Sequence, residues 1–343
     1  MVILSMVTMP RGFVRSVGDD EQIIFIPNTA RVLANGNIEL HVDAWIYELE
    51  RRPGLSRILA HYLDLDLDSI TDAERELFIQ RTQLFRVDSQ NSMRLSIKLP
   101  DAARHTLLQS AAGGRVSERV VVDAPYLTPQ SQWVEFTAIM APGDTRVFQG
   151  RSLLMSERGL SVVSDIDDTI KYSNVLKKKL LLLNTFTRPF LALPQMAQRY
   201  QAIAAADPST SFHYVSSSPL QLYPPLAGFL ADSGFPAGTV HLRESTSVRN
   251  VIPQHADSRN HKLGTIRRLL ADFLERRFLL IGDSGELDPE IYGEIAREFP
   301  RRIEGIRIRD VTGDPRQSER YDQAFARLPP NLWELFGDTP AWR

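Results

Sequence analysis

The sequence predicts a chain of two domains, a β-rich sandwich-like domain followed by an α/β domain built on a mostly parallel sheet. Its 343 residues suffice for two domains at the usual length of roughly 100–200 residues each. Short strand-like segments separated by turns fill the first part, and from residue 159 strand, loop and helix alternate. We therefore expect a β-rich accessory domain over 1–155, an α/β domain over 156–312 and a C-terminal docking segment over 313–343.

The first part is expected to form a sandwich or barrel with one helical insertion. Its strand-like segments are rich in β-branched and aromatic residues. The insertion is predicted over 55–62 and 71–83, where Thr71 followed by Glu74 is typical of a helix start. The expected strands cover 23–26, 38–45, 93–99, 120–122 and 133–140.

The second part alternates buried strands with amphipathic helices, which is typical of a doubly wound α/β domain. Helical spacing of apolar residues runs from Leu263 to Leu274 and from Ile291 to Phe299. Sites in such domains lie at the carboxyl ends of the strands. The tail, with its aromatic residues from Tyr321 to Phe336, is expected to form a helix docked on the body. The expected strands cover 160–163, 212–215, 240–242, 278–281 and 303–308.

Composition excludes several classes of function. Forty basic and forty-two acidic residues give a formal charge of −2, so no overall field attracts nucleic acid. The chain has no cysteine, which removes disulfides, thiolate zinc sites and cysteine nucleophiles. No apolar run approaches the ~18–20 residues of a transmembrane helix. We interpret the opening MVILSMVTM as a mature soluble N-terminus and expect a cytoplasmic protein that could associate peripherally with membranes.

Three carboxylates follow the first predicted strand of the α/β domain, at Asp165, Asp167 and Asp168, with Thr169 after them. Two like charges at ~4 Å repel by roughly 4 kcal/mol at an effective dielectric constant near 20. Such clusters occur where a cation lies among them or where one carboxylate stays protonated. The alternative is an acidic turn that caps the next helix.

The second strand ends in a run of serines. Ser216, the last strand residue, could hydrogen-bond a bound oxyanion, whereas Ser218 before Pro219 is expected to cap a helix. His213, inside the strand, is expected to be a hydrogen-bonded sheet residue.

Lysine is rare in this chain, with six against thirty-four arginines, so its placement is informative. Lys262 is expected to open a helix over 262–275, against the macrodipole, which suggests a point charge aimed at a phosphate. A neutral surface lysine is the alternative.

The fourth strand ends at Gly282-Asp283, where Asp283 has the position of a metal ligand and Asp288 could bind metal or cap a helix. The Gly-Asp-Ser-Gly run over 282–285 also occurs in trypsin-like proteases, but the strand–loop–helix context excludes that interpretation.

Taken in order, Asp-x-Asp-x-Thr, the strand-end serine, the lysine and Gly-Asp-x-x-x-x-Asp resemble the four motifs of the haloacid-dehalogenase-like phosphotransferases, whose sheet is Rossmann-like. A closer resemblance is to the catalytic domain of the actin-patch-protein type of phosphatidate phosphatases, over about residues 160–311. Ser217 departs from the family pattern, where many relatives have asparagine. The segments that carry this resemblance are 164–170, 212–223, 241–244, 261–262 and 282–292.

The resemblance implies a phosphatase that hydrolyses a phosphomonoester, phosphatidate to diacylglycerol, through an aspartyl-phosphate. Asp165 would attack phosphorus, and Asp167, held protonated by its acidic neighbours, would donate a proton to the leaving alcohol. Ser216 and Lys262 would hold the phosphoryl oxygens. Thr169, Ser217 and Lys171 are expected to contact the substrate.

The incoming phosphate brings nearly two further negative charges, so the resemblance and the charge balance together imply Mg²⁺. The expected ligands are the Asp165 carboxylate, the backbone carbonyl of Asp167 and the side chain of Asp283, with Asp288 acting through water or at a greater distance.

The substrate remains open at this point. Lys177–Lys179 adjoin four leucines, which indicates either recruitment to an anionic membrane at ~1 kcal/mol per lysine or a small flap with a solvated face. A phospholipid at a membrane surface is the expected partner, and no protein partner is indicated. The alternatives are a phosphatase of a soluble phosphomonoester, and a lipid- or protein-binding module with a vestigial site. The β-rich domain could simply pack and orient.

Overall fold

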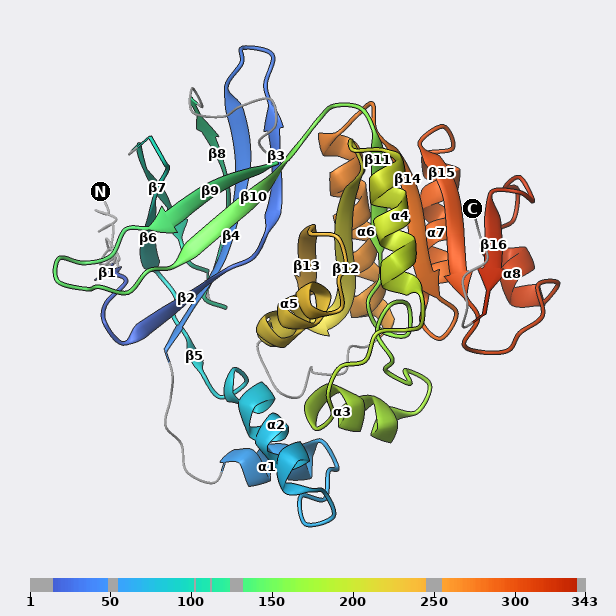
Figure 1. Ribbon diagram of the computed structural model, residues 1–343, viewed down its shortest axis with the longest axis horizontal. Coiled ribbons are helices and arrows are strands. Elements are labelled where there is room, and N and C mark those ends of the chain that lie inside the picture. The colour runs from blue at the N-terminus through green and yellow to red at the C-terminus, as the bar shows by residue number, and fades with distance from the viewer. Residues whose placement is uncertain are drawn as a thin grey trace, which may run out of the picture.

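Two sheets organise the chain, a ten-stranded sheet from the first part and a six-stranded sheet from the second (Figure 1). The computed structural model describes residues 15–48, 55–101, 103–111, 113–123, 132–244 and 255–337. The opening MVILSMVTM lies outside the described residues. Within these ranges no helix has both the length and the apolar character needed to cross a membrane.

The first sheet is mostly antiparallel and bends on itself. Its hydrogen-bonded order is β1-β6-β9-β10-β3-β4-β2, with β5 and β8 on β4 and β7 on β6. The two layers expected of a sandwich are thus parts of one continuous sheet, and β7 lies against β8 where the ends approach. Leu40, Ile97 and Val134 are among the buried side chains of its core. The strands are β1 (Arg15–Ser16), β2 (Glu21–Phe25), β3 (Asn28–Val32), β4 (Ile38–Glu48), β5 (Asp88–Ser89), β6 (Met93–Lys98), β7 (Arg104–Gln109), β8 (Arg115–Val122), β9 (Trp133–Ala138) and β10 (Gln149–Met155).

The predicted helical insertion is confirmed as α1 (Leu55–Tyr62) and α2 (Asp72–Gln83). Thr71 caps α2: its hydroxyl accepts from the Glu74 N–H, and the Glu74 carboxylate accepts from the Thr71 N–H. This capping box satisfies two N–H groups that the helix itself cannot bond.

The second sheet is all parallel, in the order β13-β12-β11-β14-β15-β16. The predicted alternation of strand and helix is confirmed, because continuous apolar runs such as Val162–Val163 are buried under helices on both faces. The haloacid-dehalogenase-like detail and the division at 155 and 312 stay predictions. The strands are β11 (Leu160–Ser164), β12 (Ser211–Pro219), β13 (Thr239–Arg243), β14 (Arg277–Asp283), β15 (Ile303–Arg309) and β16 (Trp333–Phe336). The helices are α3 (Lys178–Phe186), α4 (Met196–Ala206), the 3₁₀ turn η1 (Leu220–Leu222), α5 (Tyr223–Asp232), α6 (His255–Asp272), α7 (Asp288–Glu298) and α8 (Glu319–Ala324).

The tail differs from its prediction. A helix does form there, as the short α8, but Trp333–Phe336 form β16, which extends the sheet beside β15. The Trp333 ring stacks on Phe325 with centroids 4.2 Å apart. An edge strand such as β15 exposes N–H and C=O groups, and β16 satisfies them.

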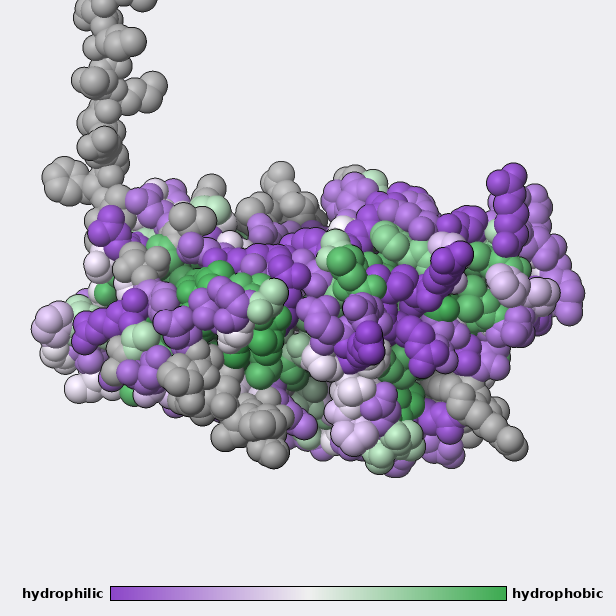
Figure 2. Space-filling model, turned by 90° about the horizontal axis from the view of Figure 1, so that it is seen from above, coloured by the Kyte–Doolittle hydropathy of each residue, from purple (hydrophilic) through white to green (hydrophobic). Residues whose placement is uncertain are grey.

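The amino ends of the parallel strands are held together by one side chain. Arg276 is fully buried and donates to the carbonyls of Ser156, Leu160 and Ser209. The loops at this end are thereby tied to one another, and the carboxyl ends remain available for a site. Seen from above, the molecule presents mainly hydrophilic side chains with smaller hydrophobic patches between them (Figure 2).

Candidate active site

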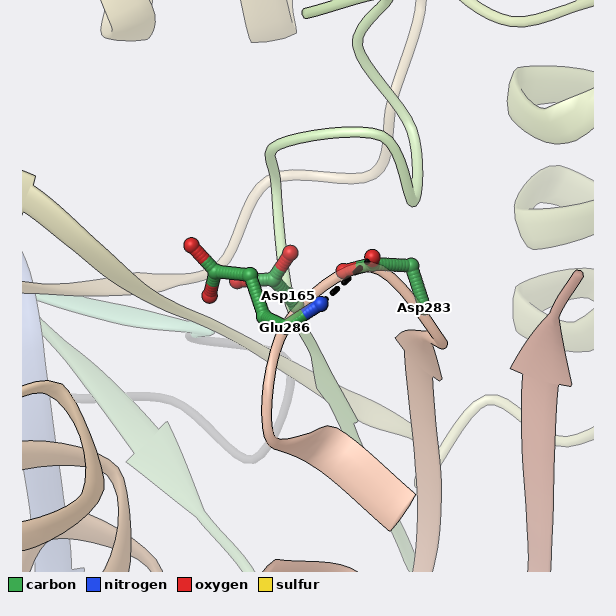
Figure 3. Close-up of side chains that lie close together, drawn as sticks. All are labelled: Asp165, Asp283 and Glu286. Atoms are coloured by element: carbon green, nitrogen blue, oxygen red, sulfur yellow. Dashed lines mark hydrogen bonds between the residues drawn. The ribbon is translucent and has the colours of Figure 1, made fainter. Parts of the chain in front are cut away.

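At the carboxyl ends of the parallel strands, Asp165 directly after β11 and Asp283 at the end of β14 meet side chains from β12, from α6 and from the loop after β14. One oxygen each of Asp165, Asp283 and Glu286 lies within 4.8 Å of the others (Figure 3). The Asp283 carboxylate is oriented by its own loop, since its Oδ1 accepts from the N–H groups of Gly285 at 2.6 Å and Glu286 at 3.1 Å. The predicted approach of Asp165 to Asp283 is confirmed.

Two oxygens of this cluster lack a hydrogen-bond donor although they are buried. Asp283 Oδ2 has none, and Asp165 Oδ1 has none in hydrogen-bonding geometry, although the Lys262 ammonium lies 2.9 Å away as an ion pair. Asp165 Oδ2 accepts from the Thr169 hydroxyl at 3.2 Å. Buried acceptors without donors are rare and call for an explanation such as an ion.

Lys262 joins three carboxylates. Its Nζ lies 2.9 Å from Asp165, 2.9 Å from Glu286 and 2.6 Å from Asp288. Burial acts to lower the pKa of Lys262, but these carboxylates outweigh it and hold the pKa well above its ordinary value.

Lys262 lies among the carboxylates of the cluster, but its expected position at the start of a helix is wrong. Lys262 lies in the middle of α6, which already runs from His255. The argument from an unfavourable helix dipole therefore does not apply. The apolar periodicity from Leu263 onward marked only the buried part of the helix.

The cluster carries more negative charge than its one lysine balances. Burial raises the pKa of Asp165 and of Asp283 well above the ordinary value, and the neighbouring carboxylates Asp288 and Glu286 add to the rise. Four carboxylates around one ammonium, with two oxygens undonated, fit a divalent cation with oxygen ligands. The donor set therefore fits Mg²⁺.

Asp167 is surrounded by donors instead. The Lys171 ammonium lies 2.7 Å from Oδ1, which also accepts from the Ser173 hydroxyl at 2.7 Å. On Oδ2, Ser218 donates at 2.9 Å and Ser216 at 3.3 Å. Burial acts to raise the pKa of Asp167, but Lys171 and the hydroxyls lower it to about 2.

The expectation that acidic neighbours keep Asp167 protonated is therefore contradicted for this state of the site. Lys171, which we expected to contact substrate, is itself buried and paired with Asp167. The charge of Asp167 is compensated before any substrate arrives.

The hydrogen-bond partners of Ser216, Ser217 and Ser218 differ from those predicted. Ser216, expected to bond a bound oxyanion, donates to Asp167, and so does Ser218, which the sequence predicts to cap a helix. Strand β12 continues through Pro219, and the 3₁₀ turn η1 that follows it has Pro219 as its N-cap without a side-chain cap, so Ser218 caps no helix. The Ser217 hydroxyl bonds that of Ser258 on α6.

Asp168 does not join the acidic cluster. It has a positive φ of 51°, and its carboxylate accepts from the N–H groups of Ser173, Asn174 and Val175. It thereby shapes the loop after the first motif and positions Ser173 next to Asp167.

Asp288 begins α7 without capping it. Its Oδ1 bonds Lys262 and its Oδ2 accepts from the Asp283 N–H at 3.2 Å. A Cβ on Gly282 would lie 2.3 Å from Asp288 Oδ2, so the glycine makes room for this contact. Asp288 thus orients Lys262.

Sequence reasoning missed Glu286, Ser173 and Ser218. Glu286 follows Asp283 by three residues in a strand-end loop, which is a usable signal, but the motif drew attention to the aspartates alone. Ser173 reaches Asp167 only because of the path of the loop after the first motif, and local sequence patterns do not predict that path.

A small cavity of about 40 Å³ adjoins Asp167. It is lined by Leu181, Leu182 and Phe186 of α3 and also by Ser218 and Glu286. The leucine run thus packs beside the site, as in the flap interpretation, while Lys177–Lys179 are exposed.

Comparison with known proteins matches this half of the chain. Residues 160–310 match the family described as phosphatidate phosphatase APP1, catalytic domain. The phosphatidate phosphatase APP1 of Saccharomyces cerevisiae is 31% identical over 188 residues, which are 53% of this chain and 31% of the yeast protein. An uncharacterized protein of Schizosaccharomyces pombe is 35% identical over 168 residues, 47% of this chain and 27% of that protein.

The chain thus spans less than a third of the length of these curated relatives. The shared segment contains the acidic cluster, Lys262 and the serine run. The segment over residues 160–310 is thus similar in sequence to the catalytic domain of the phosphatidate phosphatase APP1 family.

Proposed function

We propose that the chain is a Mg²⁺-dependent, haloacid-dehalogenase-like phosphatase that hydrolyses phosphatidate to diacylglycerol and inorganic phosphate. The observation that carries this proposal is the buried cluster of Asp165, Asp283 and Glu286, with two undonated oxygens, inside the segment that matches the catalytic-domain family. The similarity to a phosphatidate phosphatase suggests the substrate, and the acidic cluster suggests how the reaction is catalysed.

The cation would be held by Asp165, Asp283 and Glu286, together with the backbone carbonyl of Asp167. A bound Mg²⁺ would neutralise charge on the phosphoryl group and on the surrounding carboxylates. Asp288 would keep its present role of holding Lys262.

Asp165 is the proposed nucleophile. Its oxygen would form a bond to phosphorus while the bond to the leaving alkoxide breaks, which leaves an aspartyl-phosphate. Thr169 orients this carboxylate through Oδ2. Lys262, fixed between Asp165 and Asp288, and the Ser216 hydroxyl would contact the transferring oxygens. Ser217, which lines the small cavity, would contact the leaving group.

Asp167 is the proposed general acid and base. It is ionised in the resting site, so it would take up a proton when the dianionic phosphate arrives and raises its proton affinity. It would give that proton to the leaving alkoxide and then accept one from the water that hydrolyses the aspartyl-phosphate. The close Lys171 would stabilise the carboxylate that results.

An anionic membrane surface is the proposed location of the substrate. Three apolar side chains near the site are exposed: Tyr172 by 47%, Leu176 by 54% and Leu191 by 60%. The Tyr172 N–H donates to the Leu191 carbonyl at 2.8 Å, so two of them lie together. Lys177–Lys179 directly follow Leu176. Apolar side chains next to exposed lysines suit an anionic lipid surface.

The decisive experiment is phosphate release from dispersed phosphatidate with and without Mg²⁺. Release that depends on Mg²⁺ supports the proposal, and its absence with every phosphomonoester tested would refute it. A panel of sugar phosphates and nucleotides at the same concentration tests whether the enzyme prefers phosphatidate to soluble phosphomonoesters. Faster turnover of a soluble substrate would still support a phosphatase but would refute phosphatidate as its substrate.

Membrane association is tested by sedimentation with phosphatidate-containing vesicles at low and high salt. Replacement of Lys177–Lys179 by glutamine should abolish the salt-sensitive part of binding. Equal binding of this variant and the wild type would contradict the surface proposed here.

A further inference from the structure

We propose that Arg81, in the helical insertion of the β-rich part, is a positioning residue that holds α3 as one wall of the active site. The inference rests on the proposed function for the identity of that site. Helix α2 packs against α3 although about a hundred residues separate them in the chain (Figure 1). The Phe186 ring of α3 contacts Phe78 and Phe85 edge-on, with centroids 6.5 and 5.7 Å apart.

The guanidinium of Arg81 makes its contacts at the C-terminal end of α3. Its Nη1 donates to the carbonyl of Thr185 at 2.9 Å and to that of Arg188 at 2.6 Å. The guanidinium also lies 3.9 Å from the centroid of the Phe190 ring. The last carbonyls of a helix have no partner within it, and a cation there complements the helix dipole. A planar guanidinium can satisfy two carbonyls and stack on a ring at once, which a lysine cannot.

The same segment touches the reacting groups by two routes. Leu181, Leu182 and Phe186 line the cavity beside Asp167. The Phe190 ring, on which Arg81 stacks, also lies 4.8 Å from the Lys171 ammonium, and Lys171 pairs with Asp167. One arginine from the first part of the chain therefore holds both the apolar wall and the ring beside Lys171.

This arrangement predicts a role in substrate choice. The phosphoryl group would be attacked by Asp165 and held by Lys262 and Ser216, and the contacts of Arg81 described above include none of these three. The apolar leaving group would lie against α3, whose position depends on Arg81. Loss of Arg81 should therefore weaken binding of an acylated phosphomonoester more than binding of inorganic phosphate.

The test compares Arg81→Leu and Arg81→Lys with Arg57→Leu, which removes an exposed arginine from α1 of the same insertion. KM is measured with dioctanoyl phosphatidate, and inorganic phosphate is used as a competitive inhibitor to obtain its Ki. We expect Arg81→Leu to raise KM for dioctanoyl phosphatidate about tenfold and to leave Ki for inorganic phosphate within about twofold. The reason is that the variant loses the hydrogen bonds from the charged guanidinium to the end of α3, whereas the groups that hold the phosphoryl group are unchanged. Arg81→Lys should fall between, and Arg57→Leu should match the wild type.

An unchanged KM, or KM and Ki rising together, would overturn the proposal, since a merely structural arginine would affect both constants or neither. If circular dichroism shows that Arg81→Leu does not fold, KM and Ki of Arg81→Lys decide the question instead.

Amide hydrogen exchange tests the contact of Arg81 with the end of α3, here called the clamp, and does not require an active enzyme. In Arg81→Leu the amides of α3 should exchange about tenfold faster, while those of α7 stay unchanged. Unchanged exchange in α3 refutes the clamp even in an active enzyme. A wild type that releases no phosphate from any substrate, with faster α3 exchange in the variant, refutes the proposed function and supports the clamp.

Discussion

Asp165 and Asp167 lie two residues apart at the end of one strand, yet their surroundings are opposite. Asp167 is enclosed by Lys171 and three serine hydroxyls, and its pKa falls to about 2. Asp165 shares one lysine with Asp288 and Glu286, keeps an undonated oxygen, and has a raised pKa. Both residues lie beyond β11, which ends at Ser164, so their different partners are set by the loop after the strand.

The difference teaches how one short motif supports two chemical roles. A carboxylate whose charge is balanced in advance is stable without ligands and changes its proton affinity when a phosphate arrives. A carboxylate in a group with too little positive charge needs a cation before it can act as a nucleophile. The predictions below test this contrast, from the largest expected effect to the smallest.

Asp165→Asn should abolish turnover of phosphatidate, by on the order of 10⁴-fold or more, because the nucleophile is lost. The fold should persist, since the change removes a buried negative charge from a crowded cluster. Phosphate release and thermal unfolding measure the two effects, with the exposed Asp232→Asn as control. Substantial residual turnover would remove Asp165 from the role of nucleophile.

Asp167→Asn should slow phosphate release by on the order of 10²–10⁴-fold, because proton transfer to the leaving group is lost. Substrates with a good leaving group, such as p-nitrophenyl phosphate, should suffer less than phosphatidate in the step that forms the aspartyl-phosphate. Equal losses with both substrates in single-turnover experiments would speak against a general acid.

Lys171→Met should destabilise the protein by roughly 3–5 kcal/mol at pH 7, because a buried carboxylate loses its partner. The low pKa of Asp167 contributes stability above its ordinary pKa of 3.8, and this is lost as pH falls towards about 2. The difference between wild type and variant should therefore shrink as the pH is lowered through this range.

Urea unfolding at pH 7 and at pH values between 3.8 and about 2 measures that difference. Arg57→Leu is a control that removes an exposed cation. A difference that stayed constant with pH would show that Lys171 stabilises the fold by packing, through Phe190 for example, rather than through Asp167.

Ser218→Ala should have the smallest effect, a loss of roughly fivefold in kcat/KM, which corresponds to about 1 kcal/mol for one hydrogen bond. Ser216 still donates to the same oxygen of Asp167. Ser209→Ala is the control, because its hydroxyl donates to Asp207 at the amino end of the sheet, away from the site. A loss in Ser218→Ala no greater than that in Ser209→Ala would remove Ser218 from the site.

Local patterns in the sequence were enough for the elements and for the order of the motifs. Runs such as Val162–Val163 and Leu279–Ile281 predicted buried parallel strands, because a strand covered on both faces is apolar throughout. Thr71 and Glu74 predicted the start of α2, because a capping box is made by residues three apart. The prediction that Asp165 and Asp283 meet followed from parallel strands ending at one edge.

The partners of each charged side chain depended on the tertiary structure alone. Lys171 pairs with Asp167 and Lys262 with Asp165, Glu286 and Asp288, although each lysine alone could equally have been exposed. Ser218 carried the signal of a helix cap, yet it bonds Asp167 because β12 continues past it. Strand β16 and the contact of Arg81 with α3 join segments that are distant in the chain. Periodicity and caps arise between near neighbours and can be read from the sequence, whereas ionic and edge contacts depend on where loops and helices meet in space.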